Sequence, residues 1–185
     1  MTDVQLVENY LQGDAESLEI LIARYAKRVY YFVYRYVGNE EEAEHIAQEV
    51  FVRVWRNLKK FDRKKSLSTW MFAIAKNASF DFLKKKKTIP FSAFTNEEGE
   101  NVWEETLVDS APLPNEIIEQ KGLIHMLEKA KQMLSPKYQT VLFLHYQNHF
   151  TFREISESLG ESLDTVKSRH RRALIMLRKL LPAPI

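Results

Sequence analysis

The chain has 185 residues, of which 45% are hydrophobic, and a formal net charge of +2 at neutral pH. This is enough apolar material for one medium domain or two small ones. With only 5 Gly and 6 Pro, the sequence disfavours a β-sandwich or barrel, which needs many tight turns. The absence of cysteine excludes disulfides, thiolate zinc sites and cysteine nucleophiles within the chain, and it fits a reducing compartment.

The charges are unevenly distributed along the chain. Residues 1–87 carry a net charge of +4 and residues 121–185 a net charge of +6, whereas residues 88–120 hold 8 acidic and no basic residues. Two basic blocks suit binding to a polyanion, although ordinary solvated surfaces would explain the same charges. The N-terminal segment lacks the basic start and apolar core of a signal peptide, and no apolar run is long enough to span a membrane. We therefore expect a cytoplasmic protein without membrane insertion.

Helical periodicity dominates the N-terminal half. A short helix is predicted over residues 3–12, and Asp14 caps a second helix that ends at Gly38. Asn39 and Glu42 have capping-box spacing and open a third helix to about Leu58, with Trp55 among its apolar positions. After a basic loop, a fourth helix runs over residues 69–86. Four helices within residues 1–87 predict an independent bundle.

The pattern stops over residues 88–115, where prolines and clustered acids predict a linker. Helical spacing returns over residues 117–134, and Ser135 as N-cap with Pro136 in the first turn starts a helix to about His149. Thr151 and Glu154 form a second capping box, which opens a helix to Leu159. A last, basic helix follows over residues 163–181. The fold class is therefore all-α, with helical domains at residues 1–87 and 116–185.

The last two helices, with the glycine-containing turn between them, have the pattern of a helix-turn-helix. The apolar positions of the second helix, expected to face inward, are Val166, Ala173, Leu174 and Leu177. Its outer face carries basic and polar residues at Lys167, Ser168, Arg171 and Arg172. Arg can bind guanine through two hydrogen bonds in the major groove. A purely structural helical hairpin remains the alternative.

The fourth helix mixes aromatic and basic residues. Trp70, Phe72, Phe80 and Phe82 lie between lysine-rich flanks, a composition that suits single-stranded nucleic acid. The alternative is that the rings belong to the core and that the terminal lysines complement the helix dipole.

Two stretches of the sequence resemble a known family. AEHIAQEVFVRVW followed by STWMFAIAKNASFDFLKKKK resembles region 2 of the sigma-70 family, and LSPKYQTVLFLHY followed by TFREISESLGESLDTVKSRHRRALIMLRKLL resembles region 4. The order and length match the extracytoplasmic-function (ECF) group, whose members lack regions 1 and 3. The resemblance implies a sigma factor that binds core RNA polymerase, directs initiation at −10 and −35 promoter elements and helps melt the −10 region. It implies no enzyme activity, metal or cofactor.

The resemblance also assigns residues to three surfaces. The β′ clamp helices of the polymerase would contact Ile46, Gln48, Glu49 and Val52. The −10 element would be bound by Phe61, Arg63, Lys64, Lys65, Ser66, Trp70, Asn77 and Asp81. The −35 element would be read by Thr165, Lys167, Ser168, Arg171 and Arg172. Further implied partners are the β flap of the polymerase and an anti-sigma factor, a protein that often holds members of this group.

The length of the acidic linker limits how far apart the two domains can lie. Promoter elements about 25 base pairs apart lie roughly 85 Å apart at ~3.4 Å per base pair, so the linker must run extended or the domains must cover part of the distance. We expect it to occupy the RNA exit channel, where Glu97, Glu98, Glu100, Glu104 and Glu105 would mimic RNA charge. The sequence departs from the family pattern at His45, commonly acidic, and at Asp164, commonly glycine.

Other functions are weighed against this interpretation. His145 and His149 have a spacing that can bind a metal, but no third ligand or catalytic motif accompanies them. A stand-alone helix-turn-helix regulator would place a sensor or dimerisation domain in residues 1–87 and would bind duplex DNA without polymerase. A helical adaptor without DNA binding is a third alternative, which the basic helix disfavours.

Overall fold

The computed structural model describes residues 1–86 and 126–181, and every element within these ranges is helical, which confirms the predicted fold class. The N-terminal part consists of α1 (Asp3–Leu11), α2 (Ala15–Val37), α3 (Glu40–Asn57), a single 3-10 turn η1 (Leu58–Lys60) and α4 (Leu67–Lys86). Residues 126–132 are helical. The C-terminal elements that follow are α7 (Pro136–Leu142), η2 (Phe143–Gln147), α8 (Phe152–Leu159) and α9 (Leu163–Leu180). The predicted linker, residues 88–115, lies outside the described residues.

Helices α2 and α3 begin at the residues that the sequence indicates, whereas α4 begins at Leu67, two residues before its predicted start. The Asp14 carboxylate accepts a hydrogen bond from the Glu16 amide at 3.1 Å and caps α2. Gly38 ends α2 with a φ of 68°, in the left-handed region that glycine enters without strain. The Asn39 side chain then accepts from the Glu42 amide at 3.0 Å and caps α3. These local bonds fix where the chain turns between α2 and α3.

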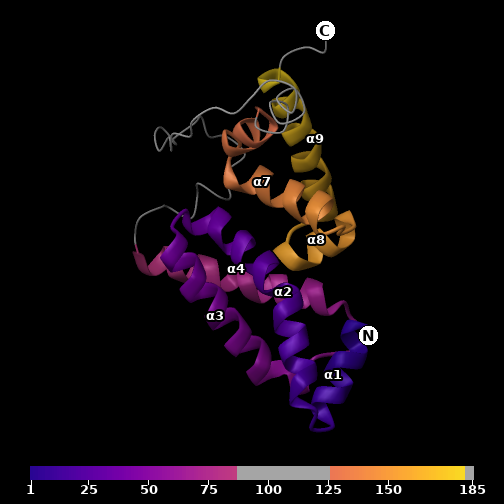
Figure 1. Cartoon of the computed structure of the whole chain (residues 1–185). Coiled ribbons are helices and arrows are strands. Elements are labelled where there is room, and N and C mark those ends of the chain that lie inside the picture. The colour runs from indigo at the N-terminus through magenta and orange to yellow at the C-terminus, as the bar shows by residue number, and fades with distance from the viewer. Residues whose placement is uncertain (87–125, 182–185) are drawn as a thin grey trace, which may run out of the picture.

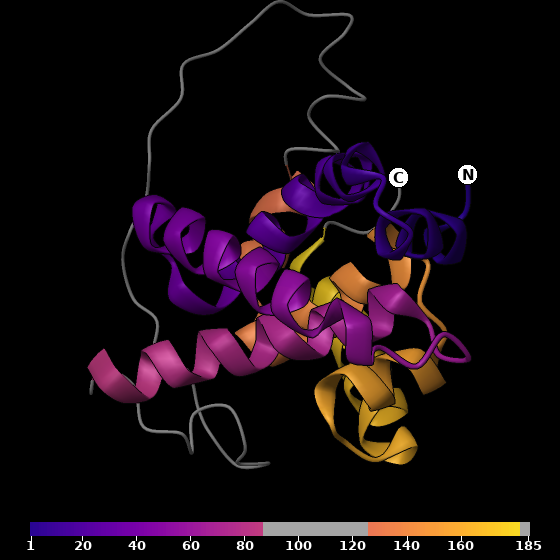
Figure 2. The same ribbon diagram turned by 90° about the horizontal axis from the view of Figure 1, so that it is seen from below.

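Helix α4 lies between the two halves of the chain. It packs against α2 and α3 on one side and against α8 on the other. Figure 1 shows α7, α8 and α9 as a layer above α2 and α4, and Figure 2 shows α4 as a long rod that runs beside α3. Contacts on several sides explain why α4 is rich in apolar residues around its circumference. Its buried side chains are Leu67, Met71, Phe72, Ala75, Ala78 and Leu83.

The predicted single helix from Ser135 to His149 is instead divided. After α7 the chain widens into one π-helical turn, η2, in which the Asn148 amide donates to the Phe143 carbonyl at 3.2 Å. The buried Asn148 side chain donates to the same carbonyl at 3.1 Å and closes the turn, and His149 reverses the chain with a φ of 57°. Ser135 is the N-cap of α7, as predicted, but its buried hydroxyl has no hydrogen-bond partner, so the cap is made by backbone geometry alone.

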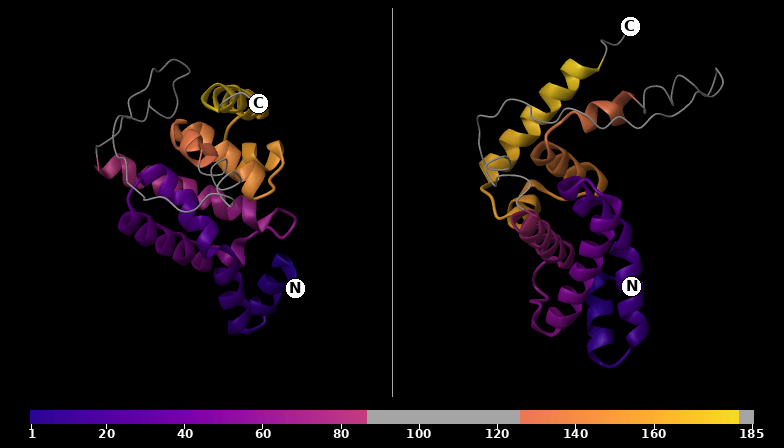
Figure 3. Two further views of the ribbon diagram at one scale, coloured as in Figure 1. Left: turned by 45° about the horizontal axis from the view of Figure 1, so that its top comes forward. Right: turned by 90° about the vertical axis from the view of Figure 1, so that its left-hand side faces the viewer.

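The two halves share one hydrophobic core. Phe143, Phe150, Ile155 and Leu159 from the C-terminal part belong to the same buried cluster as the residues of α1 to α4. The Phe72 and Phe150 rings meet edge to face with centroids 5.5 Å apart. A smaller second cluster lies between residues 126–134, α7 and α9. Both views in Figure 3 show the C-terminal layer seated directly on the N-terminal helices.

Candidate nucleic-acid interface

Helices α8 and α9 form the predicted helix-turn-helix. Thr151 and Glu154 make a reciprocal capping box, in which the Thr151 amide donates to Glu154 Oε2 at 2.8 Å and the Glu154 amide donates to Thr151 Oγ1 at 3.3 Å. Gly160 ends α8 with a φ of 62°. A residue with a Cβ would be strained there, so the glycine sets the angle between the two helices.

The second helix buries one face and exposes another. Val166 and Ala173 are completely buried and Leu177 is almost so, which confirms their inward direction. Leu174 was predicted to face inward, but it is 40% exposed because the helical repeat carries it past the packed face. Four of the five residues expected to read the −35 element are exposed: Lys167, Ser168, Arg171 and Arg172.

The start of α9 is capped by a side chain. The Ser162 hydroxyl accepts from the Thr165 amide at 3.1 Å and shares a hydrogen bond of 2.8 Å with the Thr165 hydroxyl. Thr165, expected at the DNA, is therefore half-buried and already partnered. Asp164 is exposed in the first turn, where the helix dipole favours an acid. Its departure from the family pattern is thus compatible with a stable helix.

An ion pair between Arg169 and Glu161 holds the turn to the second helix. Arg169 Nη1 lies 2.6 and 2.7 Å from the two Glu161 carboxylate oxygens, and the side chains are only 15% and 26% exposed. The Ser156 hydroxyl donates to the Glu161 carbonyl at 2.5 Å. Arg169 is therefore committed to the hairpin. Its spacing of eight residues from Glu161 spans a turn, so no helix periodicity signals the pair.

The basic loop before α4 is exposed at Arg63, Lys64 and Lys65. Arg63 Nη1 lies 3.4 Å from Glu8 Oε1 on α1, and both side chains are largely exposed, so this pair contributes little stability. Ser66 is half-buried, and its hydroxyl accepts from the Thr69 amide at 3.3 Å in the first turn of α4. The three cations are thus the accessible part of the loop.

The residues expected on α4 divide into buried and exposed sets. Phe61 is only 8% exposed and its ring lies 5.0 Å from that of Trp70, which is half-buried. The Phe61 ring fills the core at the base of the loop, and its contact with DNA stays a prediction. Asn77 and Asp81 are exposed. At seven and eleven positions after Trp70, they lie on the same side of α4.

The surface of α3 carries the residues expected to bind polymerase. Gln48, Glu49 and Val52 are exposed, whereas Ile46 is 1% exposed and packs in the core. Ile46 therefore offers almost no side-chain surface in this conformation, and its contact with polymerase stays a prediction. Trp55, one of the predicted apolar positions of the helix, is 50% exposed. Its indole nitrogen donates to the Tyr10 hydroxyl of α1 at 2.7 Å.

Hydrogen bonds and ring contacts join the two halves beside these surfaces. Lys76 Nζ of α4 donates to the Leu159 carbonyl at the end of α8 at 2.5 Å. Burial of this ammonium lowers the pKa of Lys76, and the nearby Glu161 opposes that shift. The buried Ser158 hydroxyl donates to the Thr69 carbonyl at 3.2 Å.

A second set of contacts joins α2 to η2. The Arg35 guanidinium lies 3.7 Å from the centroid of the Phe143 ring, a cation–π contact. Burial lowers the pKa of Arg35, which remains charged at neutral pH. Nearby, Arg28 Nε donates to the Asn148 side chain. These contacts hold α7 to α9 against α2 and α4 in a closed arrangement.

The histidines considered for metal binding have other contacts. His145 stacks on Phe152 with ring centroids 4.7 Å apart, and the Tyr146 hydroxyl lies 3.1 Å from His170 Nε2. Burial, and to a smaller degree the neighbouring His145, lower the pKa of His170. His149 is exposed and occupies the chain reversal instead. Among residues 1–86 and 126–181, no three His, Asp or Glu side chains gather as metal ligands.

Comparisons with known proteins agree with this geometry. The sigma-70 region 2 family matches residues 21–89, and the sigma-70 region 4 family matches residues 124–177. None of the helices described is long and apolar enough to cross a membrane.

Similar proteins of known sequence cover nearly the whole chain. It is 32% identical to the ECF RNA polymerase sigma factor SigW of Bacillus subtilis over 95% of its own length and 94% of that protein. It is 29% identical to the ECF RNA polymerase sigma factor SigE of Mycolicibacterium smegmatis over 92% of its length and 63% of that protein. The sigma factor RpoE of Bartonella quintana, solved with the anti-sigma factor NepR, superimposes with a TM-score of 0.64 at 17% identity, covering 90% of this chain and 97% of that one. The chain belongs to the sigma-70 family of RNA polymerase sigma factors, in its extracytoplasmic-function group.

Proposed function

We propose that this sigma factor binds core polymerase through α3, reads the −10 element with α4 and its preceding loop, and reads the −35 element with α9. The observation that carries the proposal is the exposure of all three surfaces in one chain. The polymerase contacts are Gln48, Glu49 and Val52, and we add Trp55. An exposed tryptophan held by a hydrogen bond is typical of residues that dominate protein interfaces.

The two DNA surfaces suit different forms of DNA. The outer face of α9 presents cations to a major groove, and Arg171 or Arg172 would contact guanine through paired hydrogen bonds. The cationic loop of Arg63 to Lys65 would follow the phosphates of a separated strand, while Asn77 and Asp81 would contact an extruded base. Extrusion costs a few kcal/mol per base, so polymerase contacts have to supply part of that free energy.

The closed packing is the state of the free chain in this proposal. Helix α8 packs against both α4 and α9, and a helix with its side chains is roughly 10 Å wide. Two promoter elements would lie roughly 85 Å apart, so α7 to α9 must detach from α2 and α4 when both elements are bound. We further propose that the chain acts in the cytoplasm, together with polymerase, and that it is a regulatory subunit without enzyme activity.

An anti-sigma factor is the proposed second protein partner. The Bartonella quintana protein of similar fold was solved with one. Such a protein would compete with polymerase for the exposed residues of α3. It would also favour the closed packing if it bound both halves.

The experiment that tests the function is co-elution with bacterial core RNA polymerase. Wild-type chain is compared with a Gln48→Ala/Glu49→Ala variant, whose side chains are exposed and therefore dispensable for folding. We expect specific binding that the double substitution weakens. Absence of binding to core, combined with tight binding to duplex DNA by the chain alone, would overturn the proposal in favour of a stand-alone regulator.

A further inference from the structure

Arg53 of α3 lies between the polymerase-facing surface and the −10-reading helix. Its Nε and Nη2 atoms both donate to Glu49 Oε1, at 3.1 and 2.7 Å. Its Nη1 atom lies 3.5 Å from Asp81 Oδ2 on α4. One guanidinium thus holds a carboxylate from each of the two surfaces.

The charges of this group are unbalanced, because two carboxylates share one cation. A guanidinium has five donors in a planar fork, so it can serve both acids at once but favours the nearer one. Glu49 makes the shorter contacts, and its hydrogen bond is the largest cause of the raised pKa of Arg53. Whatever draws Glu49 away therefore leaves Arg53 free to move onto Asp81.

We propose that Arg53 is a positioning residue that couples polymerase binding at Glu49 to DNA binding at Asp81. This rests on the proposed function of the two surfaces. When a cationic group of the polymerase pairs with Glu49, Arg53 transfers to Asp81, neutralises it and fixes its rotamer. A carboxylate beside DNA phosphates repels them, so its neutralisation strengthens DNA binding.

Thermodynamic linkage makes this coupling reciprocal. If polymerase strengthens −10 binding through Arg53, then −10 DNA strengthens polymerase binding by the same factor. The three side chains are 36% to 55% exposed, so solvent screens their interaction. The coupling factor is the ratio by which one partner changes the affinity of the chain for the other. Arg53 is expected to contribute roughly threefold to tenfold to it, near the low end of couplings between sites.

The test measures the affinity of the full chain for core polymerase with and without saturating DNA. The DNA is a single-stranded oligonucleotide carrying the −10 element of a promoter first mapped by transcription with this chain. The ratio of the two dissociation constants is the coupling factor. We expect it to fall roughly threefold to tenfold in Arg53→Met, Glu49→Gln and Asp81→Asn alike.

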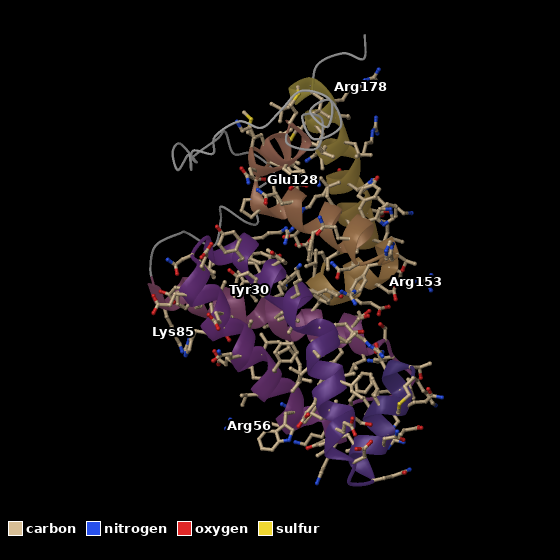
Figure 4. The ribbon with its side chains drawn as sticks, in the orientation of Figure 1. Tyr30, Arg56, Lys85, Glu128, Arg153 and Arg178 are labelled. Atoms are coloured by element: carbon tan, nitrogen blue, oxygen red, sulfur yellow. The ribbon has the colours of Figure 1, made fainter. Side chains whose placement is uncertain are left out.

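Two further variants make the result specific. Arg56→Met removes an exposed arginine three residues later on the same helix, at the lower side of the bundle in Figure 4, and should leave the coupling factor unchanged. Arg53→Lys keeps the charge but loses the fork, so its coupling factor should lie between those of wild type and Arg53→Met. A purely structural bridge would change thermal stability or both dissociation constants and leave their ratio intact.

An unchanged ratio in Arg53→Met would overturn the inference while leaving the sigma function standing. Failure of wild-type chain to bind polymerase would instead refute the proposed function on which it rests.

Discussion

Ser158 lies where α8 meets α4, and its replacement by leucine should separate the two halves of the chain. The serine is 1% exposed and donates to the Thr69 carbonyl at 3.2 Å. Loss of this hydrogen bond costs about 1 kcal/mol, and the larger side chain adds about 1–3 kcal/mol of overpacking. In the separated state the leucine would lie on the surface of α8 without strain. The sum, about 2–4 kcal/mol, shifts the equilibrium toward separation by roughly 30- to 700-fold.

The assay is energy transfer between two dyes attached to introduced cysteines. The chain has no cysteine of its own, so Lys85→Cys on α4 and Met133→Cys before α7 give specific labelling at exposed positions. The matched control is Glu157→Leu, which places the same side chain at an exposed position of α8. We expect Ser158→Leu to lower the transfer efficiency and to retain helical circular dichroism.

Substitution on the α4 side tests the same interface independently. Lys76→Met removes the ammonium that donates to the Leu159 carbonyl at 2.5 Å, and it should lower the transfer efficiency in the same direction. If Ser158→Leu and Lys76→Met show the same transfer efficiency as Glu157→Leu, the packing of α8 on α4 does not hold the chain closed and the reasoning is refuted.

Three further predictions concern the C-terminal part. Arg171→Ala should weaken −35 binding by about 1–3 kcal/mol and relax base preference. Arg178→Ala, at the opposite end of α9 from α8 in Figure 4, should instead weaken binding about equally for all sequences and reduce its salt dependence in the same binding titration. Glu161→Gln should destabilise the chain by about 1–3 kcal/mol in urea unfolding, because the largely buried Arg169 loses its charged partner. Because burial lowers the pKa of His170 below 6.5, the folded chain binds fewer protons than the unfolded one. The contribution of neutral His170 to the free energy of unfolding should therefore be fully present above about pH 6.5 and be lost as the pH falls below it. His170→Gln should remove this pH dependence in urea unfolding at several pH values.

Local chemistry explains which parts of the fold were predictable. The caps at Asp14, Asn39 and Thr151 and the glycine ends of α2 and α8 depend on bonds within a few residues, so their spacing is visible in the sequence. The π-helical turn was not predictable in the same way. It depends on the buried Asn148 side chain, whose partner in the N-terminal part is Arg28, 120 positions earlier.

In the candidate site, too, the sequence predicts exposure only where local spacing decides it. Helical spacing placed Lys167, Ser168, Arg171 and Arg172 correctly on the exposed face of α9, because one apolar stripe defines that helix. It could not separate buried Ile46 and Phe61 from exposed Val52 and Trp55, because all four are apolar. Their exposure depends on which neighbouring helices cover them, and that is fixed only by the tertiary fold.

Separation of the two halves exposes surface that a partner must cover. The Phe72–Phe150 contact and the Arg35–Phe143 contact would be lost, and each phenyl ring brought into water costs about 1.5–3 kcal/mol. Free chain should therefore remain closed and bind a two-element promoter poorly. The affinity of the polymerase-bound chain for such a promoter is then the intrinsic affinity multiplied by the fraction of open chain. With polymerase bound, Ser158→Leu should accordingly bind a two-element promoter more tightly than wild type, until the open form predominates and further loosening brings no gain.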